Sequence, residues 1–140
     1  MIIKTFNANI QTNGRDDCVD LTERVQEAVK TSGIAEGLAT IFVPGSTAAV
    51  TTVEYEAGVI QDLKEALRRF FPETQRYAHH DTAAGDNNGF SHLRAAFIGP
   101  SLTIPIVAGQ LQLGNWQQIV LIDFDIRPRS RAYTIHLLGQ

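Results

Sequence analysis

The feature that most constrains this chain is the close succession of strand-like segments in its C-terminal part. From His92 onward, short apolar and β-branched runs alternate with brief turns that contain Gly, Pro or Asn. The runs cover residues 92–98, 102–107, 110–113, 117–125 and 131–138. Parallel strands need a long crossover between them, and these turns are too short for one, so most neighbours are predicted to pair antiparallel.

The N-terminal part adds further strand-like segments. Residues 2–10 alternate loosely between apolar and polar side chains and lead to the turn signal Asn13-Gly14. Residues 38–43 form a short apolar run, and residues 47–55 are rich in β-branched side chains. All three segments are predicted to be strands.

Two helices are predicted between these strands. The first begins at Asp20, where Glu23 stands three residues later as in a capping box, and ends at Gly33. The second covers residues 57–71, where apolar side chains recur on one helical face until Pro72. Its periodicity makes it the clearest element of the sequence.

These elements predict one α+β domain over residues 1–140. In it, two helices pack on a largely antiparallel or mixed sheet of about seven strands. Residues 73–91 are rich in Gly, Asn, Asp and Thr, and they are predicted to form a long loop. Loops of this length inside a compact domain are commonly functional.

Composition excludes several classes of protein. The net charge of −3 and the pI of about 5.7 argue against a nucleic-acid-binding surface. The start of the chain lacks the layout of a signal peptide, and no apolar run approaches the ~20 residues of a membrane helix. Cys18 is the single cysteine, which excludes an intrachain disulfide and fits a reducing compartment. We therefore expect a cytoplasmic protein that binds neither nucleic acid nor membranes.

Polar and ionisable residues gather in three segments that are candidates for a functional site. The segments are residues 45–47 followed by Glu54, residues 77–92 with His79, His80, Asn88 and His92, and residues 123–131 with Arg127, Arg129 and Arg131. Ser46 and Glu54 have the same parity along a predicted strand, so they are expected on one face at opposite ends.

Each segment has a structural alternative. Ser46 and Thr47 would then only satisfy backbone groups in a turn, and His79 and His80 would be solvated loop residues. The arginines would be a salt-bridged surface, and His92 would be a structural histidine at the start of a strand.

Taken together, the segments indicate a phosphorylated ligand. Arg129 and Arg131, two positions apart, can present two planar guanidinium groups to one phosphate. Histidines and carboxylates can move protons near neutral pH or hold Mg²⁺ or Zn²⁺. The twelve residues between His79 and His92 do not match a standard metal-ligand spacing, so a metal site would depend on the fold.

An ordered series of motifs resembles the YjbQ-like family, also named secondary thiamine-phosphate synthase enzymes, over nearly the whole chain. The motifs are Ser46-Thr47-Ala48-Ala49-Val50 with Glu54, Asp62-Leu63, Tyr77-Ala78-His79, Asn88 with His92-Leu93, Ser101-Leu102 with Ile104-Pro105, Leu111 with Leu113-Gly114 and Trp116-Gln117, and Asp125 with Pro128-Arg129-Ser130-Arg131. The last of these resembles the family's Asp-Gly-Pro-Arg-x-Arg segment.

The resemblance implies a small α+β fold that assembles as a homotrimer, with polar pockets between or beside the subunits. It implies a transferase that joins a pyrimidine pyrophosphate to a thiazole phosphate and releases pyrophosphate. The site residues implied are Glu54, His92 and Asn88 for catalysis, Ser46, Thr47, Gln117, Arg129 and Arg131 for substrate binding, and His79 and His92 for a divalent metal.

Two departures from the family pattern bear on activity. Gly45 stands where the family has the histidine of His-Thr-Thr-Ala-Ala, which leaves His80 or Asp81 as possible substitute metal ligands. Arg127 is an apparent insertion, and Ile126 stands where the family has Gly. The alternative hypothesis is therefore a catalytically inactive trimer that binds a metal or a phosphate ligand. A phosphate-ester hydrolase would use the same residues and has no separate signature.

Overall fold

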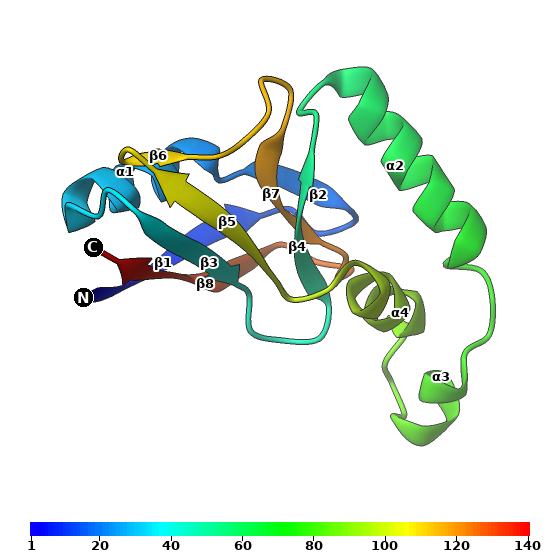
Figure 1. Cartoon of the computed structure of the whole chain (residues 1–140). Helices are drawn as coiled ribbons and strands as arrows, with labels where there is room; N and C mark the ends of the chain where they lie inside the picture. Colours follow the sequence, from blue (N-terminus) through cyan, green and yellow to red (C-terminus); the bar gives the residue numbers. More distant parts are fainter.

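The computed structural model describes all 140 residues and shows two antiparallel sheets and four helices. The larger sheet has five strands in the order β1-β8-β3-β5-β6 (Figure 1). Their bounds are β1 Ile2–Thr12, β8 Arg129–Gly139, β3 Gly37–Phe42, β5 Ser101–Val107 and β6 Gln110–Leu111. The expectation of antiparallel pairing is confirmed, since every neighbouring pair runs antiparallel.

The smaller sheet has three strands, with β7 (Gln118–Asp123) between β2 (Asp17–Asp20) and β4 (Ala48–Val53). β7 is buried on both faces. Its Ile119 and Leu121 join the core between the two sheets, and Val120 and Ile122 join a second core on the other side. Burial on both faces explains why this strand is a continuous apolar run in the sequence.

The helices cover opposite sides of this assembly. α1 (Thr22–Ser32) packs into the core between the sheets, whereas α2 (Ala57–Phe70) and α4 (Gly89–Ile98) cover the outer face of the smaller sheet (Figure 1). α3 (Ala78–Thr82) is a short helix between α2 and α4. No helix is long and apolar enough to cross a membrane.

The helix ends follow from local chemistry. Glu56 caps α2, where its carboxylate accepts hydrogen bonds from the amides of Gly58 and Val59 at 2.8 and 2.9 Å. Gly33 ends α1 in the left-handed conformation. The capping box expected at Asp20 does not form. Leu21 occupies the N-cap position, and the side chain of Asp20 accepts one hydrogen bond, from the amide of Thr22.

Several expectations were wrong in detail. The chain has four helices rather than two and eight strands rather than about seven. The predicted loop contains the helix α3, and the strand β2, which was not predicted, lies between β1 and α1. Residues 92–98 belong to the helix α4 and not to a strand. A short apolar run does not distinguish a buried strand from a buried helix, so only packing decided the conformation of this segment.

The outer face of the five-stranded sheet is not covered by any other element. Strand alternation and the pairing register place on it only uncharged residues and His136. They are Ile3, Thr5, Asn7, Asn9, Gln11, Leu38, Thr40, Phe42, Ser101, Thr103, Pro105, Val107, Ser130, Ala132, Thr134, His136 and Leu138. A large sheet face without charges is unusual for a surface that remains in water.

Gly14 is expected to tolerate no side chain. It has φ +72°, and a Cβ there would lie 2.5 Å from the carbonyl oxygen of Arg127 and 2.7 Å from that of Asp125. Gly14→Ala should therefore lower the free energy of unfolding by at least about 2 kcal/mol in urea denaturation. Gly33→Ala is the matched control, because Gly33 has φ +75° and open space, so only the ~1 kcal/mol conformational penalty applies. Equal losses would contradict this prediction.

Candidate functional site

The candidate site is a hollow of about 380 Å³ at one end of the two sheets, which we call the arginine pocket. It lies where β8 of the larger sheet approaches the end of β7. Asp123 and Asp125 continue the alternation of Ile119 and Leu121 and so face β8. The lining residues are Gly45, Ser46, Thr47, Asp86, Asn88, His92, Asp125, Ile126, Arg127, Arg129 and Arg131.

Arg131 is held by a buried carboxylate. Its Nε donates to Asp123 Oδ2 at 2.9 Å, and one terminal nitrogen donates to Asp123 Oδ1 at 2.8 Å and to Thr47 Oγ1 at 2.7 Å. Burial raises the pKa of Asp123, but hydrogen bonds from Arg131, Thr12 and the Asp125 amide outweigh it, so this pKa lies below its usual value. The other terminal nitrogen of Arg131 lies beside Gly45, where a Cβ would be 3.4 Å away.

Arg129 is held in a similar way by Asp125. One terminal nitrogen of Arg129 donates to Asp125 Oδ2 at 2.6 Å, while Asn88 Nδ2 donates to Oδ1 at 3.3 Å. The side chain of Arg129 stays about one third exposed. Burial raises the pKa of Asp125, but the Ile126 amide, Arg129 and Asn88 together hold it below its usual value.

Arg127 completes the set of three cations. It is exposed, lines the same pocket and forms no ion pair with any carboxylate of the chain. Arg127 therefore adds an unneutralised positive charge to the pocket that Arg129 and Arg131 also line.

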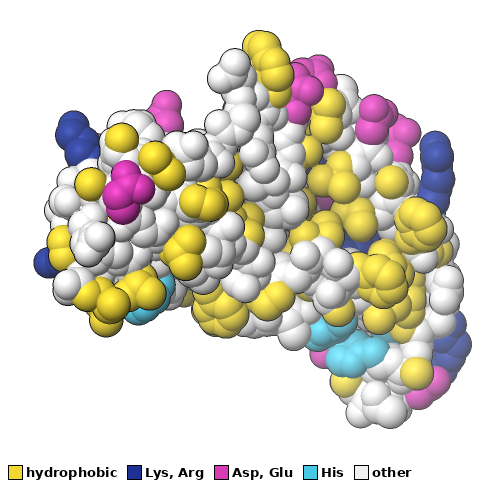
Figure 2. Space-filling view, in the orientation of Figure 1, with side chains coloured by type: hydrophobic (Ala, Val, Ile, Leu, Met, Phe, Trp, Pro, Cys, Tyr) yellow, Lys and Arg dark blue, Asp and Glu magenta, His cyan; other side chains and the backbone are white.

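His79 and His92 lie together beside the arginine pocket. Their ring centroids are 4.6 Å apart, and His79 Nε2 is 3.3 Å from Asp86 Oδ2. His92 lines the pocket directly. Figure 2 shows histidine side chains gathered at the surface where α3 and α4 meet. Of the mid-chain histidines, His92 therefore shares the pocket with the three arginines, whereas His79 contacts His92 and does not line the pocket.

His80 and Asp81, the possible substitute metal ligands, contact other groups of the chain. The two ring nitrogens of His80 face the backbone amides of Tyr77 and Gly89 at 3.5 and 3.4 Å, and Asp81 pairs with Arg76. No group of three or more His, Cys, Asp or Glu side chains is placed to hold a metal ion. One chain therefore lacks the set of three protein ligands that is typical of a zinc site.

Glu54 and Gln117 do not reach the arginine pocket. Glu54 follows β4, whereas Ser46 precedes it, and eight nearly extended residues put the two ends about 25 Å apart. Glu54 lines a different hollow with Trp116 and Tyr55. Gln117 donates to Thr52 Oγ1 at 3.2 Å and accepts from the Gly114 amide at 3.0 Å. Neither Ser46 nor Glu54 lies within β4, so the expected shared strand face does not exist.

The structure also adds residues that the sequence-based selection missed. Asp86, Asp123 and Asp125 lie in the predicted polar segments but were given no role at the site, yet they orient or neighbour the residues that were. The alternation of Asp123 and Asp125 with Ile119 and Leu121 was the available signal. Cys18 takes no part, because it is buried and desolvation raises the pKa of its thiol to about 11.

Comparison with known proteins identifies the family. The family model described as UPF0047 protein YjbQ-like matches residues 6–140. The chain belongs to the YjbQ-like family. Among its relatives, a UPF0047 protein of Methanothermobacter thermautotrophicus is 33% identical over 140 residues, covering 100% of this chain and 95% of the relative. The UPF0047 protein YugU of Bacillus subtilis is 32% identical over 138 residues, covering 99% and 100%.

Solved structures of similar proteins have the same fold. A hypothetical protein of Aeropyrum pernix K1 superposes with a TM-score of 0.90 at 34% identity, covering 98% of this chain and 99% of that one. A YbjQ-like protein of unknown function from Sulfolobus solfataricus superposes with a TM-score of 0.88 at 31% identity, covering 99% of each chain. The similarity supports the family and the α+β fold, and it assigns no activity.

The two aspartates predict a loss of stability in acid. Because their pKa values are lowered in the folded state, they contribute stability that is present above the unfolded-state pKa of about 3.9 and is lost as pH falls through the folded values. The free energy of unfolding should fall below about pH 4, and Asp125→Asn should make that fall shallower. Urea denaturation from pH 3 to pH 7 measures it. Asp62→Asn, on the exposed side of α2, is the control, and an unchanged slope in Asp125→Asn would contradict the prediction.

Proposed function

We propose that this protein binds a phosphorylated small molecule in the arginine pocket. The observation that carries the proposal is the convergence of Arg127, Arg129 and Arg131 around one hollow that His92 also lines. Planar guanidinium groups suit the oxygen atoms of a phosphate, and alternate positions along the chain bring their donors to one place.

The arginines are prepared for an anion in two different ways. Asp123 and Asp125 fix the orientation of Arg131 and Arg129, so little side-chain entropy is lost on binding. The terminal nitrogen of Arg131 beside Gly45 donates to neither Asp123 nor Thr47, which hold the rest of the guanidinium. Arg127 supplies charge that no carboxylate neutralises. The absence of a side chain at Gly45 leaves room for a ligand beside Arg131.

A transferase of the thiamine-phosphate type is a second candidate. It is favoured by the position of His92 and Asn88 in the same pocket as the arginines, where an imidazole can carry a proton and an amide can orient a substrate. In that reaction Arg129 and Arg131 would stabilise the departing pyrophosphate electrostatically. Glu54 and Gln117 take no direct part within one chain, since both lie at the far end of β4. This separation favours the alternative of a binding protein without transferase activity.

The proposal is tested by calorimetric titration of the purified protein with inorganic phosphate and pyrophosphate, with and without added Mg²⁺. We expect saturable binding that is tighter for pyrophosphate and weakens with salt. No heat of binding for either anion would overturn the proposal. Incubation with a pyrimidine pyrophosphate and a thiazole phosphate then separates the two candidates, because pyrophosphate release supports the transferase and binding without release supports a binding protein.

We also propose that the protein assembles as a homotrimer through the uncharged outer face of the five-stranded sheet. The family resemblance supports the number of subunits, and the lack of charge supports the face. Light scattering should give a mass of three subunits. Thr40→Arg, in the middle of that face, should give monomers, whereas Gln61→Arg, on the exposed side of α2, should not. A wild-type monomer at micromolar concentration would contradict this proposal.

A further inference from the structure

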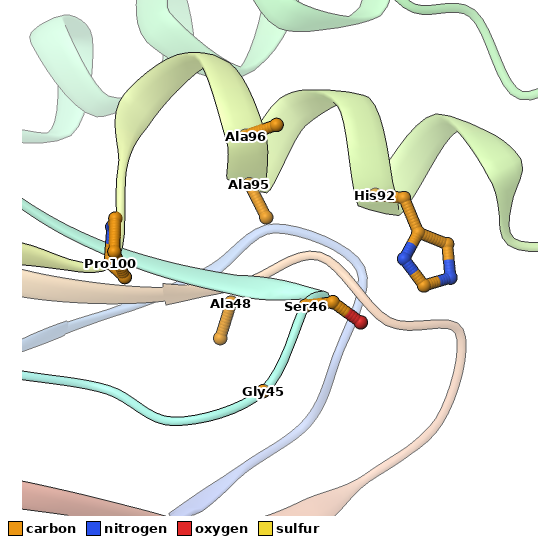
Figure 3. Close-up of a pocket in the computed structure, with 7 residues that line it drawn as sticks. All are labelled: Gly45, Ser46, Ala48, His92, Ala95, Ala96 and Pro100. Atoms are coloured by element: carbon orange, nitrogen blue, oxygen red, sulfur yellow. The ribbon is translucent and has the colours of Figure 1, made fainter.

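The two ends of β4 carry hollows of different chemistry. At its start, Ser46 and His92 lie at one end of a hollow whose other walls are small and apolar (Figure 3). Beyond its end lies a separate hollow of about 410 Å³, which we call the acidic hollow. The side chains that define it are the carboxylates of Asp20, Glu54 and Glu56 and the side chains of Tyr55, Trp116 and Gln118.

Hydrogen bonds between three segments of the chain hold the acidic hollow in shape. It lies between the segment that joins β4 to α2 and the loop before β7, which Figure 1 shows side by side. The Tyr55 amide donates to Gln118 Oε1 at 2.8 Å, and Gln118 Nε2 donates to the Asn115 carbonyl at 3.5 Å. The Tyr55 hydroxyl donates to the carbonyl of Cys18 in β2 at 3.1 Å. Little order therefore has to be created when a ligand binds.

The negative charge of the acidic hollow is not neutralised within the chain. No Lys or Arg lines the hollow, and none forms an ion pair with Asp20, Glu54 or Glu56. Arg24 donates to the main-chain carbonyl of Asp20 and not to its carboxylate. The N-terminus of α2 offsets part of the charge of its cap, Glu56, whereas Glu54 is exposed and has no such partner. Figure 2 shows acidic and hydrophobic side chains side by side at this end of the molecule. This hollow is therefore complementary to a cation.

Two exposed aromatic rings distinguish this hollow from an ordinary acidic surface. The side chains of Trp116 and Tyr55 are 75% and 46% exposed. Burial, and after it the negative charge of nearby acidic groups, raises the pKa of Tyr55, so its phenol stays neutral and keeps its hydrogen bond. The face of an aromatic ring attracts a cation, and tryptophan does so most strongly. The three carboxylates do not form a group placed to hold one metal ion, whereas carboxylates beside aromatic rings suit a cation that carries alkyl groups.

We propose that the acidic hollow binds a small organic ammonium ion whose nitrogen carries methyl groups. The positive charge lies near Glu54 and Asp20, and the methyl groups contact the rings of Trp116 and Tyr55. The inference goes beyond the proposed function and does not depend on it, since the length of β4 separates this hollow from the arginine pocket. It gives a role to an exposed tryptophan and to a carboxylate that does not reach the arginines.

Trp116 is the single tryptophan of the chain, so tryptophan fluorescence reports on this hollow alone. The test titrates the protein with choline and with dimethylbutanol, the uncharged analogue of choline in which carbon replaces the nitrogen. Potassium chloride keeps the ionic strength constant. Choline should change the Trp116 emission saturably, with a dissociation constant in the millimolar range, and the uncharged analogue should bind at least about tenfold more weakly. No saturable change with choline, or an equal response to the analogue, would overturn the inference.

Two variants locate the bound choline. Glu54→Gln should weaken choline binding about fivefold, because it removes one negative charge beside the ligand. Glu27→Gln, at an exposed position of α1, makes the same change of net charge away from the hollow and should stay within about twofold of the wild type. Trp116→Ser, at a position exposed enough to leave the fold intact, should abolish the NMR saturation transfer from the protein to the choline methyl groups. Equal losses in the two glutamate variants, or unchanged transfer in Trp116→Ser, would overturn the inference and leave pyrophosphate binding in the arginine pocket unaffected.

Discussion

Replacing Arg94 with methionine is expected to lower the free energy of unfolding by about 3 kcal/mol. The Arg94 side chain is fully buried, and one terminal nitrogen donates to Asp16 Oδ1 at 2.8 Å. Its other donors reach the carbonyl oxygen of Phe71 at 2.7 and 3.2 Å, and its guanidinium lies 4.6 Å from the centre of the Phe90 ring. Methionine fills much of the same space but leaves the Asp16 carboxylate and the Phe71 carbonyl without these donors.

Urea denaturation of the two proteins measures this effect. Arg68→Met is the matched control, because Arg68 contacts the same Asp16 carboxylate at 3.4 Å but is half exposed. A surface ion pair contributes at most about 1 kcal/mol, so the control should lose much less stability than Arg94→Met. Similar losses in both variants would show that burial of Arg94 does not determine its contribution.

The Arg94–Asp16 pair also explains how the site is positioned. Arg94 belongs to α4, which carries His92, and Asp16 belongs to the turn between β1 and β2. The amides of Arg15 and Asp16 in that turn donate to the carbonyl oxygens of Asp125 and Asp123, at 2.6 and 2.8 Å. The buried pair therefore joins the helix that carries His92 to the end of β7, whose aspartates hold Arg129 and Arg131.

The double variant Arg127→Ala/Arg129→Ala is expected to weaken pyrophosphate binding by about 100-fold or more. A hydrogen bond to a charged group contributes about 1.5–3 kcal/mol, and the variant removes the donors of two such groups. It also leaves the Asp125 carboxylate without Arg129, so the pocket becomes less positive. Calorimetric titration at fixed salt gives the dissociation constants.

Arg69→Ala is the matched control for the arginine variants. Arg69 is on α2, is 81% exposed, and its loss changes the net charge of the protein without touching the pocket. Its binding of pyrophosphate should stay within about twofold of the wild type. If Arg69→Ala weakened binding as much as Arg127→Ala alone, the anion would be held by the general charge of the protein rather than by the arginine pocket.

A helix or strand could be predicted from the sequence when a repeating pattern of neighbouring residues determines it. The helix predicted over residues 57–71 is α2, Ala57–Phe70, because its apolar face repeats over four turns. The segment 92–98 was assigned wrongly, because seven residues carry too few repeats to separate the two periodicities. The strand β2 was not predicted, because two of its four residues, Asp17 and Asp20, are uncommon in strands. Pairing with β7 stabilises it.

The residues of the candidate site could also be predicted only in part. Arg129 and Arg131 share one face of β8 by strand alternation, and this part could be derived from the sequence. The position of Glu54 could not, since the length of β4 separates it from the pocket although the family resemblance groups it with the other site residues. Asp123 and Asp125 meet the arginines only because the two sheets pack face to face and bring the end of β7 to β8, which no local pattern predicts.

The sequence by itself determined the antiparallel pairing, a strand at the place of β7, the helix α2 and the spacing of Arg129 and Arg131, two positions apart. Each of these depends on residue periodicity or on connection length, which are properties of neighbouring residues. Only the tertiary structure decided that residues 92–98 are helical, that His92 reaches the arginines and that Glu54 does not. These outcomes depend on packing and buried ion pairs between distant segments, such as Asp16 with Arg94, whose energies no local pattern contains.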